Sequence, residues 1–470
     1  MTLRLHDTLT RTMKAVEPLE PGHVRLYTCG PTVWNRSHIG NFRTFLFEDV
    51  LRRWLDRRCD RVTHVMNLTD VDDRIISNAV SNDHSLEEET APWIAAFFED
   101  LDALGVRRAH HYPRATEYVN EMVELIARLD QAGATYASEG SVYFHIAAFP
   151  QYGALSGLRA EGLVAGASGR VDSDDYTKED VRDFALWKGV GADDIGWDTR
   201  LGRGRPGWHI ECSAMSMALL GESFDIHCGG VDNVFPHHEN EIAQSEAATQ
   251  RPFAQIWCHA AHLQIGGEKM AKRLGNFRFV PDLVASGAPP AVIRYFLISG
   301  AHYRRQLSWD EDAFSASVSA VERLVDFRDR VVALVPAPGA VEGRISRVVD
   351  IAWTTFSAAM DDDLNVPEAV AAIFVAVRDV NREMDAGPVS SGDCVAALRL
   401  LADVDGILGI LPLVDRDRGD LDADSQALLN ERERVRAQRD WAASDRIRDE
   451  LASRGVVIED TPRGQRWKRA

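Results

Sequence analysis

Two cysteines, a histidine and a glutamate have the side chains for a metal site, although they lie far apart in the sequence. Cys29 precedes a Gly-Pro turn, Cys212 lies mid-chain, and His237 and Glu241 are four residues apart in PHHENEIAQS. On a helix, residues at this spacing share one face. Two thiolates, an imidazole and a carboxylate are donors that zinc accepts. A buried cysteine is more often a small apolar core residue, so these four residues alone leave both interpretations open.

A second group of residues could bind phosphate. The segment SHIGN, residues 37–41, lies where a predicted strand gives way to a predicted helix. A helix N-terminus presents unpaired backbone N–H groups and the positive end of the helix dipole. Gly40 would let a nucleotide approach the backbone, and His38 and Asn41 could donate hydrogen bonds to phosphate oxygens. A histidine at a helix start is also commonly a cap, so both roles remain possible.

The third candidate is a basic loop, GGEKMAKRLGN, at residues 266–276. Lys269, Lys272 and Arg273 have glycines on either side, which suggests a loop that closes positive charge over a polyphosphate. For such a run taken alone, a solvated basic turn is the commoner outcome.

A β–α–β pattern must position these residues. HVRLYTCGPTV predicts a buried strand, residues 39–58 predict a helix, and RVTHVMNLTD predicts a second strand. The natural arrangement is a parallel pair, and parallel sheets bind ligands at the carboxyl ends of their strands. The sheet pattern resumes at SFDIHCGG and IWCHAAHLQIGG. The candidate residues fall at such strand ends.

The rest of the chain divides into further units, with a helical run from about residue 311 and a Gly/Asp-rich break at residues 413–423. We expect the first half of a catalytic domain at 1–115, a connective insertion at 116–200, the second half at 201–265, a linker with the lysine loop at 266–310, a helical bundle at 311–412 and a small C-terminal domain at 424–470.

Composition limits the possible functions only mildly. The chain has 45% hydrophobic residues, no signal-peptide-like start and no uncharged apolar run of membrane-spanning length, so we expect a cytoplasmic protein. Its six cysteines are scattered, which favours free thiols or metal ligands over disulfides. A net charge of −19 argues mildly against nucleic-acid binding. Residues 431–470, however, carry eleven basic and eight acidic residues, which permits a polyanionic partner there.

Taken together, the motifs closely resemble those of the cysteinyl-tRNA synthetases. TCGPTVWNRSHIGN, GWHIECSAM, DIHCGGVDNVFPHHENEIAQS and GGEKMAKRLGN occur in the family's order, and so do PRATEYVNEMVELI, DDDLNVPEA, RDWAASDRIRDEL and VIEDTPRGQRW. They include the "HIGH"-type and "KMSKS"-type signatures of class I synthetases. The resemblance runs from about Leu5 to Trp467. Several long motifs in one order are far more specific than any single one.

The resemblance implies a fold and a reaction. The fold would be α/β: a doubly wound parallel, Rossmann-like catalytic domain with a connective insertion, followed by a helical bundle and a small C-terminal mixed domain. The reaction would be ATP-dependent activation of L-cysteine to cysteinyl-adenylate, with Mg²⁺ accompanying the ATP, and transfer to tRNA(Cys). The family also suggests a monomer.

The resemblance assigns roles in the active site residue by residue. Cys29, Cys212, His237 and Glu241 match the family's zinc ligands, one ion per chain. Zinc prefers thiolate, so it could select cysteine over serine, which a hydrophobic pocket separates poorly. Thr69 and Trp208 match positions that line the cysteine pocket, and Asp232 matches one that contacts the adenosine. For the ATP phosphates, the matching residues are His38, Gly40 and Asn41, and for the charge that develops during the reaction they are Lys269 and Lys272. The catalytic residues would be His38, Asn41 and the two lysines.

In the C-terminal domain, five residues match positions that read the anticodon: Arg436, Trp441, Asp445, Arg448 and Asp460. An indole can stack on a splayed base, and Asp and Arg can hydrogen-bond to base edges. For each residue singly, a surface helix with charges at i and i+4 is an equally good interpretation.

Two other functions remain as alternatives. One is a paralogue like the ligase that joins cysteine to a glucosaminyl-inositol, which shares the catalytic core but typically lacks the anticodon module. The other is a non-catalytic paralogue that binds tRNA or senses cysteine. Charged tRNA, an amide-linked thiol and the absence of adenylate would distinguish the three.

The lysine loop departs from the family's usual Lys-Met-Ser-Lys-Ser, because Ala271 and Arg273 replace both serines. Both lysines remain, so the charges are retained. Losing the hydroxyls removes hydrogen bonds that could order the closed loop, and Arg273 adds a charge. We expect a working enzyme with altered loop kinetics, measured by cysteine-dependent ATP–pyrophosphate exchange. The absence of exchange in well-folded, zinc-loaded protein would contradict this expectation.

Overall fold

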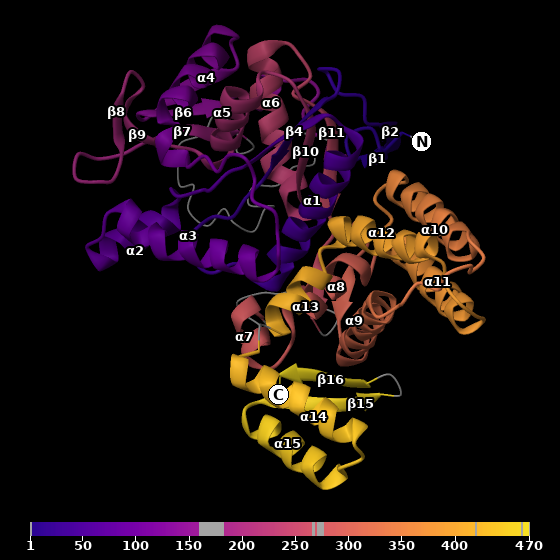
Figure 1. The fold of residues 1–470 in the computed structure, drawn as a ribbon. Helices are drawn as coiled ribbons and strands as arrows, with labels where there is room; N and C mark the ends of the chain where they lie inside the picture. Colours follow the sequence, from indigo (N-terminus) through magenta and orange to yellow (C-terminus); the bar gives the residue numbers. More distant parts are fainter. Residues whose placement is uncertain are drawn as a thin grey trace.

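A parallel sheet with helices on both faces forms the centre of the protein, and a helical bundle and a small C-terminal unit follow it (Figure 1). The structure is a computed structural model that describes residues 2–158, 183–265, 268–269, 277–418, 421–461 and 464–469. In the described part of the chain, no helix is long and apolar enough to cross a membrane.

The central sheet confirms the predicted parallel arrangement. Its strands follow the order β11 (Ala254–Ala260), β10 (Phe224–Gly230), β3 (His23–Thr28) and β4 (Arg61–Met66), and every neighbouring pair is parallel. Consecutive residues such as Leu26 and Tyr27 join different hydrophobic cores on the two faces, as the alternation of side chains along a strand requires. A sheet buried on both faces is typical of a doubly wound fold.

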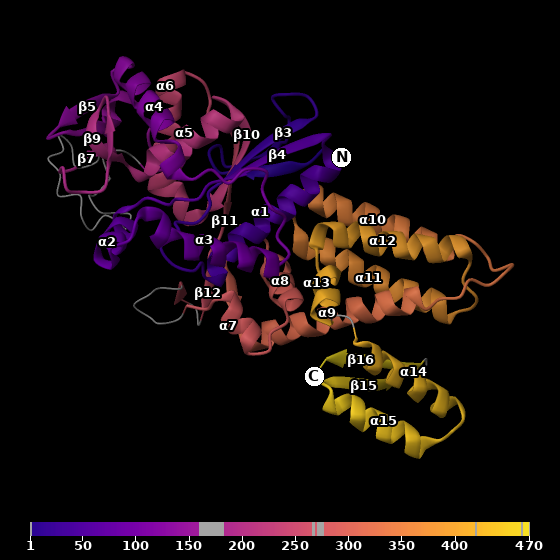
Figure 2. The same ribbon diagram turned by 60° about the vertical axis from the view of Figure 1, so that its left-hand side comes forward.

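Helices cover both faces of the central sheet (Figure 2). One face packs on α1 (Ile39–Arg58), whose bounds match the predicted helix. The other packs on three helices: α4 (Val119–Gln131), α5 (Trp208–Leu220) and α6 (Glu239–Thr249). A short hairpin, β1 (Arg4–Asp7) with β2 (Thr12–Ala15), lies at the N-terminus, and α2 (Asp73–Asn82) and α3 (Leu86–Ala103) follow β4.

The segment expected to be a connective insertion contains a second sheet, which is entirely antiparallel where described. Its strands follow the order β5 (Thr135–Ser138), β6 (Ser141–Phe144), β7 (Phe184–Gly189), β9 (Gly202–Pro206) and β8 (Trp197–Thr199). The predicted helix and the short strand SVYFHI are present as α4 and β6. The β8–β9 hairpin continues to Pro206, past the boundary expected at residue 200.

Short elements connect the catalytic unit to a bundle of long helices. The connection consists of β12 (Leu263–Ile265), β13 (Glu268–Lys269), α7 (Val280–Ala285), α8 (Pro290–Ser299) and β14 (Leu307–Trp309). The bundle consists of α9 (Glu311–Val332), α10 (Arg344–Asp361), α11 (Val366–Asp385) and α12 (Ser391–Leu408). A further helix, α13 (Leu411–Arg418), occupies the start of the expected Gly/Asp-rich break.

The C-terminal unit pairs two helices with one hairpin, below the bundle in Figure 2. It contains α14 (Ala423–Ala437), α15 (Trp441–Ser453) and the antiparallel strands β15 (Val456–Thr461) and β16 (Gly464–Arg469). Its core is small and centres on Leu429, Leu451 and Val456.

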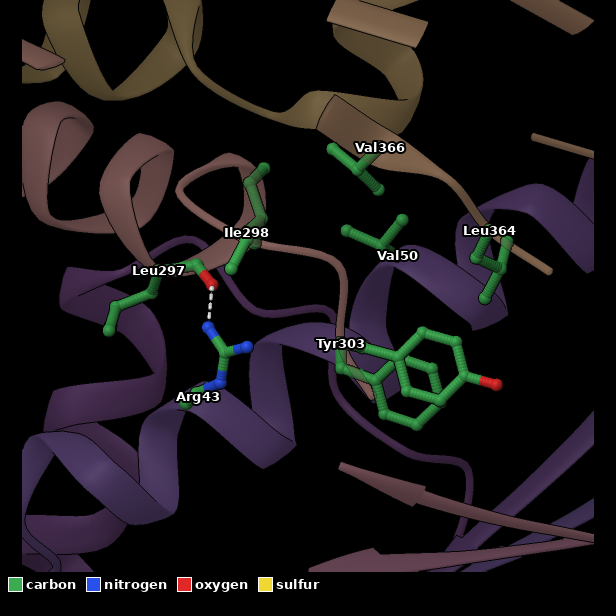
Figure 3. Close-up of a pocket in the computed structure, with 9 residues that line it drawn as sticks. Arg43, Val50, Leu297, Ile298, Tyr303, Leu364 and Val366 are labelled. Carbon is green, nitrogen blue, oxygen red and sulfur yellow. Dashed lines mark hydrogen bonds between the residues drawn. The ribbon is translucent and has the colours of Figure 1, made fainter. Parts of the chain in front are cut away.

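Helix α1 is tied to the following units by buried arginines. Arg43 donates to the carbonyl oxygens of Ala261 (3.0 Å) and Leu297 (3.3 Å), beside a small cavity that apolar side chains from α1, α8 and the start of α11 line (Figure 3). Further along α1, Asp49 pairs with Arg53 (2.8 Å) and with the fully buried Arg294 of α8. Charges buried in this way must be paired, so these contacts fix α1 against α8.

Glu48, also on α1, is a buried carboxyl group whose ionisation should lower stability. Its side chain is fully buried, and burial raises its pKa well above the usual value. The folded protein therefore holds this proton to higher pH than the unfolded chain, and stability falls as the pH rises from the unfolded pKa towards the folded one. We expect Glu48→Gln to be more stable than the wild type at pH 8, with an unfolding free energy higher by about 1 kcal/mol or more and a higher unfolding temperature. The difference should be smaller at pH 4.5.

Thermal unfolding at both pH values measures this difference. The exposed Glu322 on α9 provides the control, since Glu322→Gln should leave the pH dependence unchanged. A Glu48→Gln protein that is no more stable than the wild type at pH 8 would show that the carboxylate is accommodated without cost.

Candidate active site

The predicted metal ligands come together at the carboxyl ends of β3 and β10. Cys29 directly follows β3, Cys212 lies in α5, His237 lies in the turn Val234–His238 after β10, and Glu241 lies in the first turn of α6. One ligand atom from each lies within 4.8 Å of all the others, and all four residues are buried. The sequence therefore identified side chains that the fold places around one point.

The distances within this cluster suit a zinc ion. The sulfur atoms of Cys29 and Cys212 are 4.0 Å apart, close to the ~3.8 Å that two thiolates at about 2.3 Å from a tetrahedral zinc would have. His237 Nε2 lies 3.1 Å from Glu241 Oε1. Four donors with two soft sulfurs fit zinc better than a hard cation, which would prefer oxygen ligands.

Electrostatics point in the same direction. Burial raises the pKa of the Glu241 carboxyl well above its usual value, and burial and Cys212 do the same for the Cys29 thiol. A divalent cation between them would favour both deprotonated forms. Burial alone therefore disfavours ionisation of both groups, and a bound cation would oppose this effect.

Three buried histidines beneath the cluster were not predicted from the sequence. His227 Nε2 lies 2.9 Å from Glu241 Oε2, and His238 Nε2 lies 3.2 Å from Cys29 Sγ. His238 Nδ1 in turn lies 2.8 Å from His259 Nε2. Burial lowers the pKa of His227 and His259 to about 3, so both rings are neutral. The motifs DIHC and WCHA place His227 and His259 on strands, where no spacing marked them as ligands, and His238 directly follows the predicted ligand His237.

These histidines create a second possible ligand set that overlaps the first. Cys29 and Glu241, together with His227 and His238, also offer four ligand atoms within 4.8 Å of one another. The contacts of His227 and His238 with Glu241 and Cys29 have the geometry of hydrogen bonds, by which outer groups orient metal ligands. The set with two thiols is the better zinc site.

Of the two residues predicted for the amino-acid pocket, Trp208 contacts the cluster directly, and Thr69 lies beside the turn that follows Cys29, where its N–H donates to the carbonyl oxygen of Pro31. The Trp208 ring stacks on His237 with centroids 4.2 Å apart and an angle of 23° between planes. His209 Nδ1 lies 3.0 Å from His237 Nδ1, so the ring of His237 is held from two sides. Thr69 is buried and accepts a hydrogen bond from Asn67 Nδ2 (3.1 Å).

The turn after β3 depends on a glycine. A Cβ on Gly30 would lie 1.8 Å from the carbonyl oxygen of Asn67, so no side chain fits there. The amide N–H of Gly30 also donates to Asn67 Oδ1 (3.0 Å). This close approach joins the segment after β3 to that after β4, where Thr69 pairs with Thr32.

The segment SHIGN, predicted to bind phosphate, lies at the N-terminus of α1. His38 is the N-cap, its Nδ1 accepts from the Asn41 N–H (3.3 Å), and Asn41 Oδ1 accepts from the His38 N–H (3.1 Å). Because Nδ1 is an acceptor, the neutral ring carries its proton on Nε2. The ring also stacks on Phe277, with centroids 5.0 Å apart. The capping role is therefore present, and it leaves Nε2 as the donor atom; Gly40 lies in the first turn of α1.

The other predicted nucleotide residues are only partly placed. Asp232 lies in the turn Val231–Asn233 at the end of β10, where a Cβ on Gly230 would lie 2.6 Å from its Oδ1. The backbone of Lys269 lies in β13, which pairs antiparallel with β12. Lys272, Ala271 and Arg273 lie outside the described residues.

The five residues of the C-terminal unit that were predicted to read the anticodon lie close together. Arg436 Nη1 lies 3.0 Å from Asp460 Oδ2, and its guanidinium lies 5.5 Å from the Trp441 ring. Arg448 pairs with Asp445 at 3.0 Å and adds to the positive field at Asp460. Trp441 is 56% exposed, an unusual degree for an indole. The structure thus provides one charged surface with an accessible aromatic ring.

Three family models match successive parts of the chain. Residues 15–319 match the class I (C) tRNA synthetase catalytic domain, residues 355–412 the DALR domain, and residues 418–467 the cysteinyl-tRNA ligase anticodon binding domain. Among curated proteins, the chain is 46% identical to the cysteine–tRNA ligase of Solibacter usitatus, covering 100% of both chains. It is 44% identical to that of Protochlamydia amoebophila, covering 99% of this chain and 98% of the relative.

Solved class I synthetases share the fold. The methionyl-tRNA synthetase of Mycobacterium tuberculosis bound to methionyl-adenylate has a TM-score of 0.61 at 14% identity, covering 90% of this chain and 96% of that one. The leucyl enzyme of Agrobacterium radiobacter, in a ternary complex, has a TM-score of 0.59 at 11% identity, covering 84% and 85%. The predicted α/β fold with a Rossmann-like catalytic domain is confirmed.

Metal titration can distinguish the two overlapping ligand sets. We expect the wild type to bind one Zn²⁺, and its Co²⁺ form to show a sulfur-to-metal charge-transfer band from two thiolates. Cys212→Ser should weaken that band to about half and lower zinc affinity by about tenfold or more. Cys394→Ser, in α12, is the control and should bind like the wild type. Undiminished affinity in Cys212→Ser, with loss in His227→Ala, would favour the set with His227 and His238.

Proposed function

The chain belongs to the cysteine–tRNA ligase family of class I synthetases, and we propose that it activates L-cysteine with ATP and transfers the cysteinyl group to tRNA(Cys). One observation carries the amino-acid part of this proposal: the buried cluster of Cys29, Cys212, His237 and Glu241 lies at the carboxyl edge of the parallel sheet, where class I folds bind their substrates.

The proposal assigns a task to each unit. The catalytic halves, residues 1–115 and 201–265, would bind cysteine and ATP, and the insertion, residues 116–200, would cover the pocket. The linker, residues 266–310, carries the lysine loop. The helical bundle, residues 311–412, and the C-terminal domain, residues 424–470, would bind tRNA(Cys). We propose that the protein acts as a monomer in the cytoplasm.

Cysteine selection would depend on the buried cluster. A zinc ion held by the four residues would supply one thing, an additional coordination position that prefers a thiolate to a hydroxyl. The chain supplies the rest. Trp208 and His209 hold the His237 ring so that its Nε2 faces Glu241. His227 holds the second oxygen of Glu241. Thr69 and the Trp208 indole would line the pocket above and exclude larger side chains.

Adenylate formation would occur between this cluster and the start of α1. The cysteine carboxylate attacks the α-phosphate in line, the α–β bridging oxygen leaves with pyrophosphate, and Mg²⁺ accompanies the nucleotide. His38 would donate from Nε2 to a phosphate oxygen, and the N-terminus of α1 and Gly40 allow close backbone approach. Asn41 would add a side-chain donor, and Asp232 would contact the adenosine. Lys269 and Lys272 would neutralise the charge that develops on the leaving group.

In the second step, the terminal adenosine hydroxyl of the tRNA attacks the carbonyl carbon of the adenylate, and AMP leaves. The tRNA would be held at its other end by Arg436, Trp441, Asp445, Arg448 and Asp460. The match of residues 418–467 to an anticodon binding domain supports tRNA, rather than a glucosaminyl-inositol, as the acceptor. The exposure of the Trp441 ring supports a role for it as a stacking platform.

Charging of a tRNA(Cys) transcript tests the whole proposal. We expect cysteine to be attached and serine to be rejected by a factor of about 10⁴ or more, because a hydroxyl replaces the sulfur ligand. Chelation should abolish charging, and added Zn²⁺ should restore it. Charging that survives complete removal of metal with its selectivity intact would separate specificity from the cluster. An amide-linked thiol product, or no adenylate, would instead support one of the two alternative functions.

A further inference from the structure

Beneath the proposed anticodon surface lies a buried arginine, Arg432, to which no role has yet been assigned. Arg432 lies on α14, and its side chain is fully enclosed in the small C-terminal unit. A guanidinium keeps its charge in such a place, so every N–H that points inward needs an acceptor. The partners that the structure provides therefore show what the residue is held against.

Those partners lie on the hairpin and on α15. The Nη1 and Nη2 atoms of Arg432 each lie 2.8 Å from one oxygen of Asp460, forming a two-pronged ion pair. Nη1 also donates to Gln465 Oε1 at 2.8 Å, and Nε donates to the carbonyl oxygen of Ser444 at 3.3 Å. Gln465 is itself held, because its Nε2 donates to the carbonyl oxygen of Leu429. The guanidinium therefore has one orientation.

Asp460 connects this buried arginine to the surface. The Asp460 side chain is 39% exposed, whereas that of Arg432 is 1% exposed. Its Oδ2 also accepts from Arg436 at 3.0 Å. A carboxylate offers about four acceptor positions, and among the described side chains Arg432 and Arg436 take three of them. Asp460 can therefore accept a further hydrogen bond from the solvent side without losing its contact with Arg432.

We propose that Arg432 is a positioning residue for anticodon recognition: its two-pronged contact fixes Asp460 so that the remaining outward acceptor position meets an N–H donor on the edge of an anticodon base. This proposal rests on the proposed tRNA function. A fixed carboxylate accepts only from donors, so it distinguishes base edges by their N–H groups. A freely rotating aspartate could instead turn towards Arg436 or solvent and would discriminate less.

The charge state of Asp460 supports this role. The hydrogen bonds of Arg432 are the largest influence that lowers the pKa of Asp460, and the fields of Arg432, Arg436 and Arg448 add to it. The carboxyl therefore stays ionised and acts only as an acceptor. Another pair on α14, Arg434 with Glu431, has side chains that are 62% and 42% exposed, and its ion pair lies within the helix. Burial thus sets Arg432 apart from an ordinary surface ion pair.

The test compares three full-length variants: Arg432→Met, Arg432→Lys and, as the matched control on the same helix, Arg434→Met. Lysine keeps the positive charge but, as a point charge, cannot bind both carboxylate oxygens with fixed geometry. Charging is measured with tRNA(Cys) transcripts that carry the natural anticodon or one substituted base. Each kcat/KM for tRNA is divided by the cysteine-dependent ATP–pyrophosphate exchange rate of the same preparation, which corrects for any loss of competent protein.

For Arg432→Met we expect a fall of about tenfold or more in normalised kcat/KM for the natural transcript, mainly through KM. Selectivity at one anticodon base should fall by a similar factor, and Arg432→Lys should lose this selectivity too. Arg434→Met should behave like the wild type. In an Asp460→Asn background, Arg432→Met should cause little further loss, because both substitutions remove the same contact.

Two outcomes would overturn the proposal. One is a fall in charging that is equal for all transcripts, since a merely structural arginine would weaken binding without changing base selectivity. The other is full additivity of Arg432→Met and Asp460→Asn. Because Arg432 is buried, limited proteolysis checks whether the C-terminal unit of each variant is folded. If Arg432→Met is unfolded there, the test uses Arg432→Lys instead. Exchange activity with no charging by the wild type would contradict the proposed function itself, and charging unaffected by Asp460→Asn would contradict the role of Asp460.

Discussion

The pairing of β3 with β10 is the interaction on which the site depends. These strands are almost 200 residues apart in the sequence, yet Leu26 lies opposite Ile226 and Thr28 opposite Cys228. The ladder continues one residue beyond β3, where the Cys29 N–H donates to the carbonyl oxygen of Cys228 at 3.1 Å. That bond sets the position of the Cys29 sulfur relative to the turn and helix that follow β10. A slip of one residue would turn Cys29 to the other face of the sheet.

Buried charged residues fix α1 and the N-terminal hairpin relative to the helical bundle. Asp49, in the middle of α1, pairs with Arg294 of α8, and Arg294 Nε donates to the carbonyl oxygen of Leu408 at the end of α12 (2.6 Å). Asp363, between α10 and α11, accepts from the Tyr303 hydroxyl at 2.6 Å and from the His6 N–H at 2.8 Å. Breaking one partner of a buried pair is costly. The helix whose first turn would face ATP is therefore fixed relative to the bundle that would hold the tRNA.

Sequence reasoning succeeded where periodicity or a long motif carried the signal. Periodicity predicted the α1 helix and the parallel strands, and the resemblance to the synthetase family predicted that Cys29, Cys212, His237 and Glu241 come together. His227 and Arg432 could not. A histidine on a buried strand and an arginine on a charged helix look like ordinary core and surface residues, and only the three-dimensional packing shows what they contact. The fold of the insertion also extended further than its composition suggested, since β9 pairs with β7 and β8.

The acidic character of the chain limits how it can recognise a polyanion. With a net charge of −19, the protein as a whole repels tRNA at long range, and this repulsion is screened beyond about 8 Å at physiological salt. Specificity must then come from short-range contacts. In the C-terminal unit, Arg436 and Arg448 are already paired with acidic side chains. If a base binds there as proposed, it would meet charges that are already paired, so the selectivity of this surface would depend on geometry more than on attraction. Such a surface needs its acceptors held in place before the tRNA arrives.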